Sequence, residues 1–191
     1  AIRSNELAVA ADEDYITQCR AQGLYPLAYY PHNIHFLWFA AMFDGQQAQA
    51  LTAARKVAAK IDDATLASMP MLAGFRVVPY WTLVRFGRWE EMLKEPAPPA
   101  SNDFLTGAWH YGRGEAFVAT GKLADAKREL AALDTLLKSD SMQQPLFSPN
   151  TAGGILGVGQ PLLSGLARLA KAAPGEIPRQ AYARMGRNPP A

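Results

Sequence analysis

The chain has 191 residues, of which 49% are hydrophobic and 19% are charged, and its formal net charge is +2. This composition is typical of a folded domain and argues against a disordered chain. A nearly neutral charge with scattered Lys and Arg residues argues against nucleic-acid binding, which needs a dense basic face. The most apolar patch, residues 36–43, is much shorter than the roughly 20 residues of a membrane-spanning helix, so we expect no membrane span.

The first predicted helix covers residues 1–22 and would end at Gly23, a residue type that commonly terminates helices. Apolar side chains recur along it at helical spacing, namely Leu7, Ala8, Ala11, Tyr15 and Cys19. We expect this stripe to face the core. Cys19 is the only cysteine, which excludes an intramolecular disulfide, and its place on the stripe predicts an inert core thiol.

Three glycines separate pairs of predicted helices along the rest of the chain. Gly45, Gly87 and Gly121 each follow one helical pattern and precede another. The paired helices cover residues 32–43 and 46–60, 71–86 and 88–94, and 102–120 and 123–139. Prolines predict linkers at residues 24–31 and 96–99, and Pro79 is expected to kink or restart the helix that contains it.

The last part of the chain is rich in glycine and proline. Residues 143–150 are predicted to be a loop, and the apolar, glycine-rich residues 151–172 to be a helix. The tail that follows is polar and rich in proline. Because no strand pattern with a period of two persists anywhere, the sequence predicts an all-α fold.

The three glycines also define an internal repeat. Gly87 and Gly121 lie 34 residues apart, which is the period of the tetratricopeptide helix–turn–helix unit. Gly45 and Gly87 lie 42 residues apart, and an insertion at residues 62–70 accounts for the difference. Small or apolar residues recur at the expected packing positions, namely Leu37, Ala41, Ala50, Ala54, Gly114, Ala126 and Leu130.

We therefore expect a right-handed α-solenoid of antiparallel helix hairpins, built like tetratricopeptide repeats, in a single helical-repeat domain. Its parts are a half repeat (1–23), a repeat (32–61), a degenerate repeat (71–95), a repeat (102–139), a degenerate terminal helix (151–173) and a tail (174–191). The sequence opens without Met inside a predicted helix, so we also expect it to be a fragment of a longer chain. The compartment is left open between cytoplasm and periplasm.

Several short segments carry a resemblance to a known family. They are NELA (5–8), DY (14–15), YP (25–26), YPHNIHF (30–36), and WHY with RG (109–114). Through them residues 1–140 resemble the C-terminal part of a family of bacterial tetratricopeptide-repeat proteins. The resemblance implies a tetratricopeptide fold, a general protein-binding role and upstream repeats with further histidines, but no settled reaction. After Asn150 the sequence departs from the family pattern.

His32 and His35 are the sharpest candidates for chemistry. At i and i+3 on a helix they project from nearly the same face, a spacing that allows two imidazoles to share a metal ion. Two ligands do not complete a zinc or copper site, so upstream histidines would have to supply the rest. The alternative is that His32 caps the helix while His35 lines a peptide-binding groove. His110, beside Trp109, is predicted to be a satisfied interior histidine.

Counting positions along the repeat gives the residues expected to line the concave groove. They are His32, His35, Phe39, Met42, Val77, Trp81, Arg85, Tyr111 and Glu115. Aromatic residues with one cation and one anion suit an extended peptide or an apolar ligand. The alternative is that a segment of the chain itself fills the groove.

The remaining motifs carry no catalytic pattern. The glycine run at residues 154–159 lacks the order of a nucleotide-binding loop, and the acidic pairs at 62–63 and 90–91 are placed to complement helix dipoles. We expect a non-enzymatic scaffold that binds a protein or peptide and needs no cofactor. The rival hypothesis is a metal-binding protein or metalloenzyme with a transition metal at His32 and His35. A third is a structural subunit whose groove is filled by its own chain.

Overall fold

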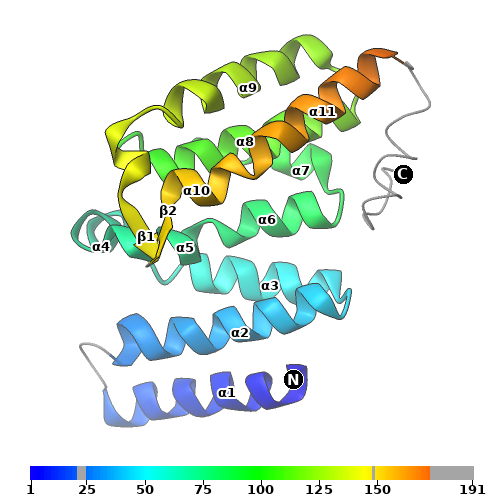
Figure 1. Cartoon of the computed structure of the whole chain (residues 1–191). Helices are drawn as coiled ribbons and strands as arrows, with labels where there is room; N and C mark the ends of the chain where they lie inside the picture. Colours follow the sequence, from blue (N-terminus) through cyan, green and yellow to red (C-terminus); the bar gives the residue numbers. More distant parts are fainter. Residues whose placement is uncertain (21–24, 148, 173–191) are drawn as a thin grey trace. The chain divides into compact units, whose positions relative to one another are not determined.

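The computed structural model describes residues 1–20, 25–147 and 149–172 (Figure 1). The described part is almost entirely helical, as the sequence predicts. The exception is a short antiparallel pair, β1 (Pro145–Phe147) and β2 (Asn150–Thr151), in which Pro145 pairs with Thr151. This pair lies where a loop was expected. The predicted cap Gly23 and the tail 174–191 lie outside the described residues. No described helix is long and apolar enough to cross a membrane.

The chain divides into two compact units, Ala1–Thr82 and Leu83–Ala191, where the sequence analysis expected one domain. We call them unit 1 and unit 2 and describe each by itself. The boundary falls inside one helix, α6 (Val78–Arg85).

Unit 1 is built on α1 (Ile2–Cys19), α2 (Tyr30–Phe43) and α3 (Gln47–Ala58), with α2 in contact with both of the others (Figure 1). A π-helical turn, Tyr25–Tyr29, leads directly into α2. The predicted linker at 24–31 is therefore wrong over its described part. Pro31 falls in the first turn of α2, where no intrahelical amide is needed and proline is tolerated.

The rest of unit 1 is a run of short helices. They are α4 (Asp63–Ser68), a 3₁₀ turn (Pro70–Leu72), α5 (Ala73–Arg76) and the first part of α6. Asp62 caps α4 by accepting a hydrogen bond from the amide of Thr65 at 2.7 Å. The helix predicted for residues 71–86 is broken before Pro79, which stands in the first turn of α6. The expected restart at this proline is thus confirmed.

The buried face of α1 differs from the prediction. Val9 and Asp12 are buried, whereas Leu7 is 55% exposed and Tyr15 is 48% exposed. Cys19 is also exposed, so the expectation of a core thiol is wrong. The physical reason is that α1 meets α2 through hydrogen-bonded carboxylates, which turns its apolar stripe away from α2.

The three glycine turns have the same backbone geometry. Gly45, Gly87 and Gly121 take φ values of 74°, 67° and 76°, in the left-handed region that favours glycine. In each turn the next residue donates its amide to the carbonyl five residues before it. These bonds run from Gln46 to Ala41 (2.9 Å), from Arg88 to Leu83 (2.8 Å) and from Lys122 to Phe117 (2.8 Å). The predicted helix–glycine–helix repeat is therefore present in the backbone.

Unit 2 is centred on the hairpin of α8 (Asp103–Ala119) and α9 (Leu123–Leu136) (Figure 1). Asn102 caps α8 by accepting a hydrogen bond from the amide of Leu105 at 2.9 Å. The short helix α7 (Trp89–Lys94) packs on α8. A 3₁₀ turn (Asp140–Gln143) leads to the strand pair, and the predicted helix at 151–173 is divided into α10 (Ala152–Gly157) and α11 (Gly159–Ala172).

Glycines in α8 allow the other helices of unit 2 to approach it closely. A Cβ atom on Gly107 would lie 2.7 Å from Leu156 of α10, and one on Gly114 would lie 2.5 Å from Leu163 of α11. The small residue predicted at position 114 is therefore required by packing. Through these contacts α10 and α11 cover one side of α8.

Candidate functional site

The most exposed aromatic surface of the described chain lies on α2. This helix is apolar on nearly all sides, and it buries Tyr30, Pro31, Ile34, Trp38 and Ala41. Phe36, Phe39 and Phe43 follow one another at i, i+3 and i+7 and are 47%, 49% and 78% exposed. Residues at this spacing lie on one side of a helix. We call these three phenylalanines the aromatic stripe.

Two rings of the stripe contact each other, and the third contacts a neighbouring histidine. The ring centroids of Phe39 and Phe43 are 4.6 Å apart, and those of His32 and Phe36 are also 4.6 Å apart. Edge and tilted contacts of this kind stabilise aromatic pairs without removing them from solvent. The stripe is thus an ordered apolar surface that extends from His32 to the last residue of α2.

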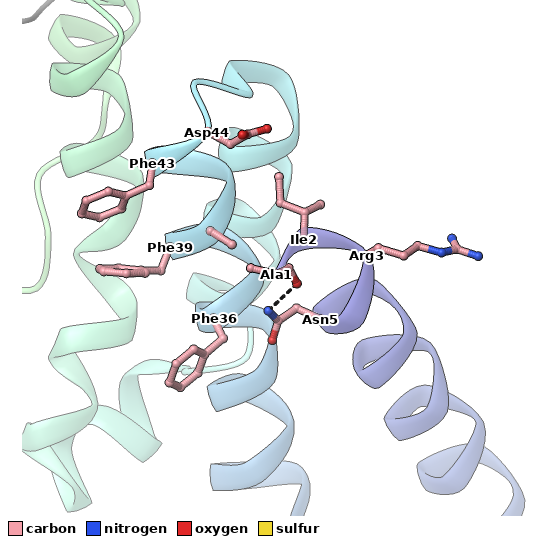
Figure 2. A pocket seen from close by; sticks show the side chains of 9 residues that line it. Ala1, Ile2, Arg3, Asn5, Phe36, Phe39, Phe43 and Asp44 are labelled. Atoms are coloured by element: carbon pink, nitrogen blue, oxygen red, sulfur yellow. Dashed lines mark hydrogen bonds between the residues drawn. The ribbon is translucent and has the colours of Figure 1, made fainter.

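The stripe borders an open groove of about 760 Å³ in unit 1 (Figure 2). The start of α1 forms the other wall, with Ala1, Ile2, Arg3 and Asn5, and Ala40 and Asp44 complete the lining. The floor is therefore mostly apolar, and the exposed Arg3 and Asp44 place one cation and one anion on the rim. An apolar surface with a charged rim is the arrangement found at protein-binding sites.

Buried polar contacts fix how α2 sits against α1. Asp12 accepts hydrogen bonds from the Tyr25 hydroxyl at 2.6 Å and from the Asn33 amide at 2.8 Å. Glu13 accepts a hydrogen bond from Tyr30 and pairs with Lys56, and these two contacts, the one with Lys56 first, lower the pKa of Glu13. Because these bonds join one face of α2 to α1, they determine which face carries the exposed rings.

The opposite side of α2 is held within unit 1 by a buried hydrogen bond. The indole Nε1 of Trp38 donates to Thr82 Oγ1 at 2.7 Å, and Thr82 Oγ1 donates to the Val78 carbonyl at 2.7 Å. A buried indole N–H needs such an acceptor. Rotation of α2 about its axis would break this bond and the bonds to Asp12, so the stripe has a defined orientation.

The two predicted histidines have different surroundings. His32 is exposed and belongs to the first turn of α2, which begins at Tyr30, so the expected capping role of His32 is wrong. His35 is partly buried, with its ring 4.8 Å from Trp38 and 5.4 Å from Phe75 between centroids. Burial, followed by the nearby charge of His32, lowers the pKa of His35 to about 4, so His35 is neutral at pH 7. Over the described ranges, no three His, Cys, Asp or Glu side chains gather as metal ligands.

The other residues predicted for the groove do not form one exposed surface. Met42 and Trp81 are half-buried, and Arg85 is exposed. Tyr111 is 7% exposed and Glu115 is 0% exposed, and the Tyr111 hydroxyl donates a hydrogen bond to the Glu115 carboxylate. A Cβ atom on Gly159 of α11 would lie 2.7 Å from the Tyr111 ring. Tyr111 and Glu115 therefore belong to the interior of unit 2, and only α2 presents predicted groove residues on an open aromatic face.

His110 takes part in a polar network inside unit 2, as the sequence predicts for a satisfied histidine. Its Nδ1 lies 2.6 Å from a Glu129 carboxylate oxygen, and Arg113 donates to the other oxygen at 2.9 Å. Burial alone would raise the pKa of Glu129, but the hydrogen bonds from His110 and Arg113 outweigh it and hold that pKa below its usual value. The network joins α8 to α9, and Arg113 also donates to the Leu93 carbonyl at 3.0 Å.

Phe36, Phe43 and Ile2 were missed by the sequence analysis. Counting fixed repeat positions selected Phe39 but passed over the two rings on either side of it. The spacing of the three phenylalanines was the available signal, but a helix that is apolar on all sides gives no contrast between its core and solvent faces.

Comparisons of this chain with protein-family models, with curated proteins and with solved structures give no match.

Proposed function

We propose that the chain is a tetratricopeptide-like scaffold that binds a protein or peptide through the aromatic stripe of α2. The observation that carries the proposal is the exposure of Phe36, Phe39 and Phe43 beside the groove at the start of α1. Leaving three rings partly in water forgoes stabilisation, since full burial of an exposed phenylalanine contributes about 1.5–3 kcal/mol. A partner that covers the rings recovers that free energy as affinity.

The repeated hairpins support the scaffold part of the proposal. The three glycine turns have matching backbone geometry, and the buried Ala50, Met92 and Ala126 follow them at the same distance along the chain. Stacked hairpins of this kind, if they continue as a solenoid, provide a rigid surface whose exposed residues vary without disturbing the core. The aromatic stripe is an exposed surface on one of these hairpins.

A metal site at His32 and His35 would need further ligands from outside the described residues. His35 is held between Trp38 and Phe75, and no specific observation favours a metal ion over these aromatic neighbours. We therefore carry the protein-binding function forward alone.

Selection of displayed random peptides on the immobilised full chain tests the proposal. We expect selected peptides to lose at least tenfold in affinity against the variant Phe39→Ala, because each 1.4 kcal/mol of lost burial is a factor of ten. Leu7→Ala is the matched control, since Leu7 is equally exposed on α1 but lies outside the groove lining. If the selected peptides bind Phe39→Ala, Leu7→Ala and the parent chain with equal affinity, the proposal is overturned.

A further inference from the structure

The two hairpins can be aligned on their turn glycines, Gly45 and Gly121, which have nearly the same φ. In that alignment Phe36, Phe39 and Phe43 of α2 correspond to Gly112, Glu115 and Ala119 of α8. All three residues of α8 are buried, whereas all three of α2 are exposed. The same face of the same repeat element is thus covered in unit 2 and open in unit 1.

In unit 2 the elements that approach this side of α8 include two helices. A Cβ atom on Gly112 would lie 2.8 Å from Met92 of α7, and one on Gly159 of α11 would lie 2.7 Å from the ring of Tyr111, whose hydroxyl donates a hydrogen bond to Glu115. Helix-on-helix packing is therefore the way in which this chain already covers the first helix of a hairpin. The open groove in unit 1 adjoins the helix-on-helix interface between α1 and α2, because these two contacting helices form its walls.

The chemistry of the stripe also favours a helix over an extended peptide. An extended peptide needs hydrogen-bond partners for its backbone, and the stripe offers aromatic rings instead of a strand edge. The one amide side chain in the groove lining, Asn5, donates to the Ala1 carbonyl at 2.9 Å. A helix satisfies its own backbone, so it can lie on the rings without an unpaired polar group.

Spacing and charge define the complementary helix. The stripe covers eight residues, a rise of about 10 Å or two helical turns, and matches apolar anchors at i, i+3 or i+4, and i+7 on a partner. Arg3 pairs with Glu6 at 3.9 Å and its side chain points away from the rings (Figure 2), so it does not set a charge on that helix. Asp44, together with the negative end of the α2 dipole, favours a cation.

We infer that the groove between α1 and the aromatic stripe binds one amphipathic α-helix of a partner protein, with aliphatic anchors on the rings and a cationic side chain facing Asp44. The inference rests on the proposed function and specifies its ligand.

The test uses two displayed libraries of peptides of about 20 residues, selected on the full chain. In one, an Ala-, Glu- and Lys-rich helix is randomised at i, i+3, i+4 and i+7. In the other, proline at every third position keeps the same randomised residues out of a helix. We expect the helical library to yield ligands that lose at least tenfold in affinity against Phe39→Ser but not against Leu7→Ser, and the proline library to yield none. Circular dichroism confirms that both variants keep their helix content.

Each other outcome has a separate meaning. Phe39-dependent ligands from the proline library alone would retain the proposed function and overturn the helical ligand. No Phe39-dependent ligand from either library would overturn both. As a control, benzoylphenylalanine is placed at position 39 and the chain is irradiated without peptide, so that any segment already covering the stripe becomes cross-linked. Cross-links to a second copy, or within the same polypeptide, would assign the cover to this chain and overturn the partner helix.

Discussion

The hairpins α2–α3 and α8–α9 share a glycine turn and differ in the chemistry of their first helix. In α8 the positions aligned with the aromatic stripe hold Gly112, Glu115 and Ala119, and all three are buried within the same unit. In α2 the corresponding positions hold phenylalanines, and they remain exposed. The backbone repeat therefore sets where a helix begins and turns, while side-chain volume at a few positions decides whether its face is closed internally or left for a partner.

The side of α8 that packs on α11 should be sensitive to added volume. We expect Gly114→Leu to lower the free energy of unfolding by about 3 kcal/mol, because the new side chain must displace Leu163 of α11. Chemical denaturation of the purified chain measures the change.

Gly165→Ala is the matched control for that substitution. Gly165 is also in a helix, but among the described residues no atom beyond its own helical backbone and chain neighbours lies within 4 Å of the place its Cβ would take. Replacing glycine by alanine there should raise stability by about 0.5–1 kcal/mol through helix propensity. Equal effects of the two substitutions would contradict the close packing of α11 on α8.

A second difference between the hairpins is a histidine in α2 whose protonation depends on pH. His35 of α2 corresponds to Tyr111 of α8, and burial lowers the folded-state pKa of His35 to about 4, against an unfolded value near 6.5. Because the unfolded chain binds the proton more tightly, the stability gained from neutral His35 is present above pH 6.5 and is lost as the pH falls towards 4.

We expect this loss to be about 1–1.5 kcal/mol between pH 7 and pH 5, after allowing for the partial exposure of the ring. His35→Phe keeps a ring beside Trp38 and Phe75 and should remove that part of the pH dependence. Unfolding free energies of both proteins at several pH values provide the measurement. Parallel pH profiles would show that His35 is not held neutral by its surroundings.

The elements of the fold follow from local sequence much more directly than the candidate site does. Gly45, Gly87 and Gly121 mark their turns because glycine adopts a positive φ without strain, and Asn102 marks the start of α8 because its side chain caps the free amides. These are interactions within a few residues, so a pattern in the sequence is enough to predict them.

The faces of the helices depend on distant residues and were predicted less well. The buried side of α1 is set by Asp12, whose partners Tyr25 and Asn33 come 13 and 21 residues later. Its apolar stripe therefore faces away from α2, against the expectation from periodicity. Tyr111 and Glu115 were placed in a groove, but α11, more than forty residues further on, packs over this side of α8. Spacing within one helix contains no information on which neighbour will cover it.

The smallest expected change in stability is the one that most directly separates the two hairpins. Phe43, at the end of the stripe, is 78% exposed, so Phe43→Ser removes little buried surface and should change the free energy of unfolding by less than about 0.5 kcal/mol. The matched change in the core of the same helix, Ile34→Ser, should cost at least about 3 kcal/mol, because Ile34 is fully buried and its large apolar side chain is replaced by a small polar one. Chemical denaturation of both variants gives the comparison. A large loss for Phe43→Ser would mean that the chain itself uses the ring for folding, and the stripe would then belong with the closed face of α8 instead of opposite to it.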